Sequence, residues 1–109
     1  MSLLGQAKEI ISTYQRHGWT LRRVLLSSGN ADLRNQAQEL LNNATVKEAD
    51  IDALWFARPS HENREAWELR LVAEQPYALF EAFEADEAEE AREEVRLEME
   101  NRMREYAAK

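Results

Sequence analysis

The segment AWELRLV, residues 66–72, decides the fold because apolar and polar side chains alternate along it. A strand has a side-chain period of two, so the tryptophan and two leucines share one face while Glu68 and Arg70 occupy the other. This alternation is typical of a sheet with one packed face and one wet face. We therefore expect helices to cover at least the face that carries Trp67.

The neighbouring segments extend this sheet. Residues 53–58, ALWFAR, predict a second strand, and the polar residues 59–64 predict the loop that follows it. Residues 77–83, YALFEAF, predict a third strand of a meander. The alternative is that they open the last helix, because Ala, Leu and Glu favour helices. A capping-box pattern at Asp86 starts that helix later, which favours the strand.

The first half of the chain alternates helix and strand. Apolar spacings of three and four predict a helix over residues 3–16, which ends before Gly18. Residues 19–26 then predict a strand that is buried on both sides towards its end. Helical spacing returns over residues 32–41. A second capping-box pattern, Thr45 to Glu48, predicts a short additional helical turn.

The last predicted helix begins at residue 86 with four acidic residues in its first turn, where the helix dipole favours them. Its Glu and Arg runs predict a solvated face with i,i+4 ion pairs. The opposite face is a narrow apolar stripe made by Ala88, Ala91, Val95, Met99, Met103 and Tyr106.

These segments give one α+β domain over residues 1–109, with the order α-β-α-β-β-β-α. We expect an antiparallel meander sheet covered by helices on one face. The length leaves no room for a second domain of ordinary size.

Charge and composition narrow the function. The net charge is −7, and residues 84–109 hold 10 acidic and five basic residues, so the acidity lies mostly in the tail. This balance disfavours general binding to nucleic-acid phosphates, which needs clustered Lys and Arg. The chain has no cysteine, no signal-peptide pattern and no apolar run of membrane-spanning length, from which we expect a cytoplasmic protein without membrane contact.

In element order alone, the chain from the second predicted helix onward resembles the double-stranded-RNA-binding domain. The basic helix start of such domains is replaced here by DEAEE, residues 86–90. Two groups of residues have the composition of a small basic patch: Arg16, His17, Arg22 and Arg23, and Arg58, Arg64 and Arg70. We expect these cations to pair with the surplus carboxylates instead. Nucleic-acid binding is therefore disfavoured.

No catalytic, metal or cofactor residue is predicted. The two histidines, His17 and His61, are not spaced as metal ligands, and none of the three glycines forms a phosphate-binding loop. The run Ser60, His61, Glu62 has the residue types of a nucleophilic triad, but side chains of neighbouring residues point apart. The sequence therefore favours a non-catalytic role.

Our leading hypothesis is a protein-interaction or regulatory domain with an unknown partner, which self-associates as a homodimer or other homo-oligomer. The alternative is a ligand-binding domain or enzyme that uses the loop between Arg58 and Arg64, and nucleic-acid binding ranks third. The predicted ligand or partner contacts are Trp55, Arg58, His61, Arg64 and Trp67.

Overall fold

The computed structural model describes residues 3–27, 35 and 44–108 of the chain. Its elements confirm the predicted α+β class. The predicted helix over residues 32–41 lies outside the described residues except for Asn35 and stays a prediction. The described elements are α1 (Leu3–Arg16), β1 (Thr20–Ser27), β2 (Thr45–Ala49), β3 (Ala53–Pro59), the 3-10 turn η1 (His61–Asn63), β4 (Glu65–Leu71), β5 (Ala78–Phe83) and α3 (Glu89–Ala107).

The strands form one five-stranded sheet in the order β2-β1-β3-β4-β5. The pairs β1–β3, β3–β4 and β4–β5 are antiparallel, and β1–β2 is parallel. Strand β5 confirms that residues 78–83 pair with β4 rather than opening the last helix. Gly18 has a positive φ of 86° just after α1, which confirms it as the left-handed cap of that helix.

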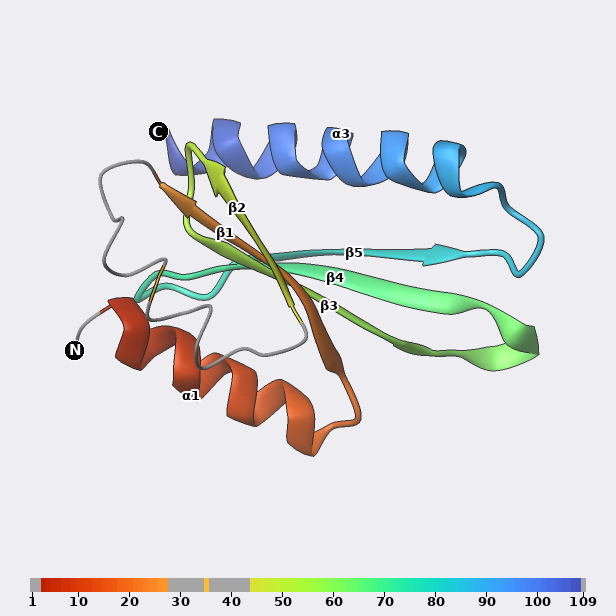
Figure 1. The fold of residues 1–109 in the computed structure, drawn as a ribbon, viewed down its shortest axis with the longest axis horizontal. Helices are drawn as coiled ribbons and strands as arrows, with labels where there is room; N and C mark the ends of the chain where they lie inside the picture. Colours follow the sequence, from red (N-terminus) through yellow and green to blue (C-terminus); the bar gives the residue numbers. More distant parts are fainter. Residues whose placement is uncertain (1–2, 28–34, 36–43, 109) are drawn as a thin grey trace.

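The expectation that helices cover a single face of the sheet is wrong, because α1 and α3 lie on opposite faces (Figure 1). The reason is visible in β3. Ala53, Trp55 and Ala57 belong to the apolar core beneath α3, whereas Leu54 and Phe56 belong to the core beneath α1. Since both faces of this strand are apolar, both need a helical cover.

Helix α1 covers the face that the alternation of β4 predicted to be wet. The ring of Tyr14 stacks on Phe56 with 4.1 Å between centroids, and its hydroxyl donates a hydrogen bond to Glu68. Burial and this hydrogen bond both raise the pKa of Tyr14. Glu68 of β4 therefore binds a side chain of α1 and is not a fully solvated residue.

The predicted helical turn at Thr45 is also wrong, because residues 45–49 form strand β2. Threonine and valine favour strands, and β1 offers an open edge with which this segment pairs, Val24 lying opposite Val46. A sheet edge formed by a distant segment outweighs the local capping pattern.

Helix α3 begins at Glu89 rather than at residue 86. The expected capping box is absent: Ala88 is the N-cap and has no side-chain hydrogen bond. A turn replaces it, in which Glu87 accepts from the backbone N–H of Glu84 at 3.0 Å. The guanidinium of Arg92 donates to the carbonyl of Glu84 at 2.7 Å and so fixes this turn.

Helix α3 is joined to the core by a buried hydrogen bond. Trp55 is fully buried, and its indole N–H donates to Glu100 at 2.9 Å. We expect Trp55→Phe to destabilise the fold, since a buried carboxylate left without its donor costs about 1–3 kcal/mol. Urea unfolding followed by circular dichroism measures this loss.

The double variant Trp55→Phe/Glu100→Met removes both partners of that bond. We expect it to lose less stability than the sum of the two single variants, because no buried carboxylate is then left unpaired. Additive losses would contradict this account of Glu100.

Candidate functional site

The loop predicted to carry function does not bring its cations together. Arg58 turns back towards α1, where its guanidinium lies 4.5 Å from the ring centroid of Trp19 and donates to the carbonyl of His17 at 2.9 Å. Arg64 instead pairs with Glu84 at 3.0 Å. The two arginines therefore serve different neighbours and do not converge on a ligand.

His61 lies exposed in η1, within the same loop. The next two residues, Glu62 and Asn63, adopt positive φ angles of 57° and 63°. The loop is therefore a tight turn between β3 and β4 with two residues in the left-handed backbone region. His61 lines none of the described pockets. No role in chemistry follows from its position.

The two predicted tryptophans lie together under α3, with their ring centroids 5.9 Å apart in an edge-to-face arrangement. Trp55 is fully buried and bonded to Glu100, so it is a core residue. Trp67 is 3% exposed, and its indole N–H donates to Glu65. Of the predicted contact residues, only Trp67 lines a described pocket.

A β-bulge in β1 supplies the cations of that pocket. The pairing of β1 with β3 slips between Leu21 and Arg23, so the usual alternation of side chains is broken there. The guanidinium groups of both Arg22 and Arg23 consequently lie near the Trp67 ring, at 5.1 and 5.7 Å from its centroid. Bulges of this kind often re-aim side chains beside functional sites.

Helix α3 supplies the other two arginines, Arg92 and Arg96. The guanidinium of Arg96 stacks on Trp67 at 4.0 Å from the ring centroid and lies 5.4 Å from the Phe83 centroid. Its side chain is only 1% exposed. The prediction that the Arg runs of this helix lie on a solvated face is therefore wrong for Arg96.

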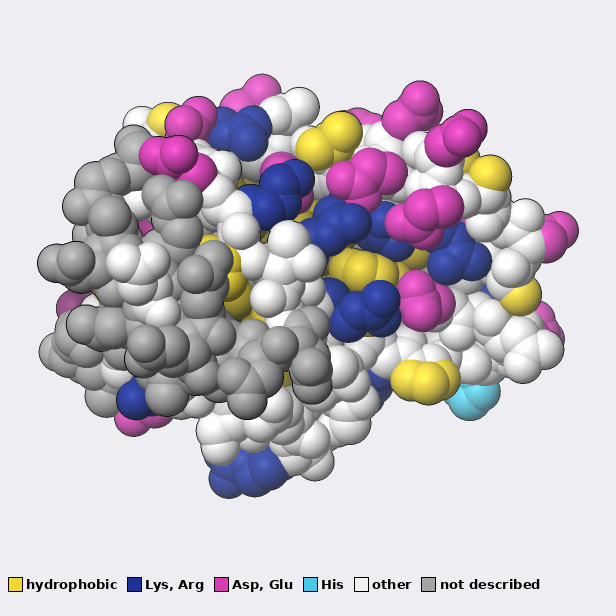
Figure 2. Space-filling model, viewed as in Figure 1, with side chains coloured by type: hydrophobic (Ala, Val, Ile, Leu, Met, Phe, Trp, Pro, Cys, Tyr) yellow, Lys and Arg dark blue, Asp and Glu magenta, His cyan; other side chains and the backbone are white. Residues whose placement is uncertain are grey.

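These side chains enclose a pocket of about 490 Å³, which we call the arginine pocket. On the molecular surface, Lys and Arg side chains gather around a hydrophobic patch, with Asp and Glu at the margin (Figure 2). The pocket is lined by Arg22, Arg23, Thr45, Glu65, Trp67, Glu89, Arg92 and Arg96.

Two of the four arginines are largely occupied by internal partners. Arg23 makes a two-pronged ion pair with Glu93, with N–O distances of 2.9 and 3.3 Å. Arg92 donates to Glu65 at 3.4 Å and to backbone carbonyls of the turn before α3. These contacts orient the pocket wall and leave few donors for a ligand.

Arg96 is paired on one side only. Its Nη1 donates to Glu89 at 2.6 Å and to Glu93 at 2.9 Å. The hydrogen bond from Arg96 lowers the pKa of Glu89. Partial burial opposes ionisation of Glu93, but hydrogen bonds from Arg23 and Arg96 outweigh it, so its pKa is also lowered.

Arg96 and Arg22 each keep N–H donors that make no described hydrogen bond. The buried Nε of Arg96 has no hydrogen-bond partner. Arg22 is exposed, and among the described residues its guanidinium contacts the Trp67 ring without pairing with a carboxylate. With four arginines set against Glu65, Glu89 and Glu93, the cluster is left with one positive charge in excess.

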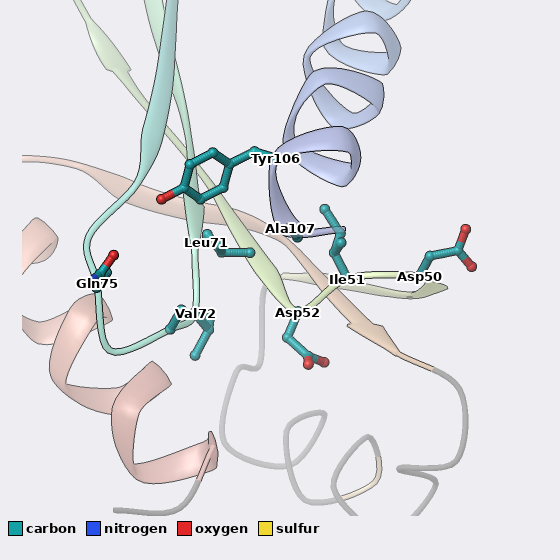
Figure 3. Close-up of a pocket in the computed structure, with 9 residues that line it drawn as sticks. Asp50, Ile51, Asp52, Leu71, Val72, Gln75, Tyr106 and Ala107 are labelled. Atoms are coloured by element: carbon teal, nitrogen blue, oxygen red, sulfur yellow. The ribbon is translucent and has the colours of Figure 1, made fainter. Parts of the chain in front are cut away.

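A second hollow lies at the far end of α3 and has a volume of about 570 Å³ (Figure 3). Ile51 and Leu71 form part of its floor, and Tyr106 of α3 borders it while stacking on Tyr77 at 3.7 Å. The carboxylate of Asp52 already accepts the backbone N–H of Ser27 at 2.9 Å. Among the described residues that line this hollow, no set of catalytic groups converges.

Comparisons with known proteins add no assignment: no family model matches the chain, and neither a curated protein nor a solved structure matches it. Within the described ranges, no group of His, Asp and Glu side chains is arranged to hold a metal ion. No helix among the described residues is long and apolar enough to cross a membrane.

Sequence reasoning named Arg22 and Arg23 only as part of a small patch with α1, and it missed Arg92 and Arg96. The available signal was the spacing of the last two, four residues apart within an acidic helix. The bulge that turns Arg22 towards Trp67 has no local signature in the sequence.

The ion pairs of Glu93 predict an acid-sensitive fold. A carboxyl group whose pKa is lowered by folding stabilises the protein above its unfolded pKa, and this stability is lost as the pH falls. We expect the urea concentration at the unfolding midpoint to decrease as the pH is lowered from about 5 to about 3. We expect Glu93→Gln to be less stable than the wild type at neutral pH, and its stability to depend less steeply on pH in this acid range.

Glu98→Gln is the matched control, because Glu98 is exposed on the same helix and has no described ion pair. It should follow the wild-type pH dependence. An unchanged acid slope in Glu93→Gln would contradict the role given to this pair.

Proposed function

We propose that this chain is a small, non-catalytic interaction domain that self-associates and accepts a carboxylate of a protein partner in the arginine pocket. The main support for the proposal is the exposed position of Arg22 without a described ion pair. The bulge places this residue beside the Trp67 ring. Arginine and tryptophan are the residues most enriched at energetic centres of protein interfaces.

The charge of the pocket supports a singly charged ligand group. One excess positive charge is neutralised by one carboxylate, whereas the nearby Glu65 and Glu89 would repel a dianion such as a phosphate. The planar guanidinium of Arg22 presents parallel N–H donors that match the two oxygens of a carboxylate. An Asp or Glu side chain of a partner fits this chemistry.

The alternatives receive less support. A ligand-binding or catalytic loop needs Arg58, His61 and Arg64 to converge, and they are dispersed instead. Nucleic-acid binding needs a broad cationic surface, whereas this chain has a net charge of −7 and its largest described arginine cluster already contains three carboxylates.

Titration with a capped tri-glutamate peptide tests the proposal, with the Trp67 indole N–H and the arginine Nε–H signals followed by NMR. We expect these signals to shift, and Arg22→Gln to weaken binding about tenfold, as expected for a lost charge-assisted hydrogen bond.

Arg16→Gln is the control, since Arg16 is exposed on α1 and its loss changes the net charge equally. It should leave the affinity nearly unchanged. Equal weakening by both variants, no shift at millimolar peptide, or tighter binding of inorganic phosphate would overturn the proposal.

A further inference from the structure

Strand β5 forms one edge of the sheet, and no described segment pairs with its outer side (Figure 1). The backbone N–H of Leu71 donates to the carbonyl of Tyr77 at 2.9 Å. Since backbone groups alternate along a strand, every second residue from Tyr77 faces β4. Ala78, Phe80 and Ala82 therefore direct their N–H and carbonyl groups outward.

The side chains of the same three residues lie on the face opposite α3, because Leu79 and Phe83 pack in the core beneath α3. Phe80 is 58% exposed, the largest exposure of any large hydrophobic residue in the described ranges. An exposed aromatic residue on an unpaired edge strand is a site for strand addition.

The sequence of this edge reads almost the same in both directions. Around Phe80, YALFEAF has Ala at both second neighbours and an aromatic residue at both third neighbours. Two copies in antiparallel pairing about Phe80 would place Phe80 opposite itself and Ala78 opposite Ala82. Glu81 would lie opposite Leu79, so no like charges meet directly.

We propose that two copies of the chain pair antiparallel along β5, with a two-fold axis at Phe80, to form a continuous ten-stranded sheet. The inference rests on the proposed self-association but not on the arginine pocket. A two-fold axis requires one surface to complement itself, which this nearly palindromic edge does. All outward N–H and carbonyl groups of Ala78, Phe80 and Ala82 would then be paired.

The opposite edge of the sheet does not offer this match. Strand β2 has five residues, and Lys47 lies at its centre. The same two-fold pairing there would oppose Lys47 to itself, and a lysine on an edge strand disfavours strand addition. The association is therefore assigned to β5.

Disulfide trapping tests the register directly, because the chain has no cysteine of its own. The double variant Ala78→Cys/Ala82→Cys keeps Phe80 and places each new thiol opposite its counterpart. Residues 78 and 82 would form a hydrogen-bonded pair, and the Cα atoms of such pairs in antiparallel sheets lie about 5.5 Å apart, within the range of a disulfide. We expect mild oxidation to give a covalent dimer in high yield.

The single variants Ala78→Cys and Ala82→Cys are the matched controls. In the proposed register the like thiols are four residues apart along the strand, roughly 14 Å, so neither single variant should be trapped. Equal trapping of single and double variants, or none in the double variant, would overturn this interface.

Light scattering of the wild-type chain and of Phe80→Lys distinguishes a failure of self-association from a failure of the β5 interface. A dimer that dissociates in Phe80→Lys supports the β5 interface, and salt should strengthen it by screening the charge of −7 on each copy. A strict monomer at millimolar concentration would overturn self-association itself. A dimer unaffected by Phe80→Lys would overturn the interface alone.

Discussion

The stacking of Arg96 on Trp67 is the interaction on which the rest of this structure depends. A guanidinium that is 1% exposed is costly to bury unless its charge is paired. Here the indole face, 4.0 Å away, supplies a cation–π contact, and Glu89 and Glu93 supply ion pairs. This arrangement fixes the position of α3 over β4.

The same interaction shapes the arginine pocket. Because Glu93 bridges Arg96 and Arg23, the helix and the bulged strand are held in one network. Of the four arginines of the pocket, only Arg22 is exposed and makes no described ion pair. In the proposed interaction, these internal ion pairs would hold the pocket wall in place and leave Arg22 for the partner's carboxylate, and such preorganisation lowers the cost of binding.

Much of the fold could be predicted from local patterns. The 3.6-residue period gave α1, and alternation gave β4 and its neighbours. The error at Thr45 arises because a capping pattern is local, whereas the open edge of β1 with which this segment pairs comes from a distant part of the chain. At the start of α3, a turn held by contacts within residues 84–92 replaces the expected capping box. The apolar run of β3 was a readable sign that both faces are covered.

The site was far less predictable. Trp67 was predicted as a contact residue from its strand, but its arginine neighbours come from a bulge and from a helix about 30 residues or more away in sequence. Periodicity assigned Arg96 to solvent because a charged residue is rarely buried without partners. Those partners are assembled only when α3 packs on the sheet.

A double-mutant cycle between Arg96 and Trp67, measured by urea unfolding, tests the central claim most directly. With Arg96→Met and Trp67→Leu, we predict that the double variant loses less stability than the sum of the singles. The expected coupling is about 1–2 kcal/mol, the range of a desolvated cation–π contact. Additive losses would show that Arg96 and Trp67 contribute independently, and would contradict the account.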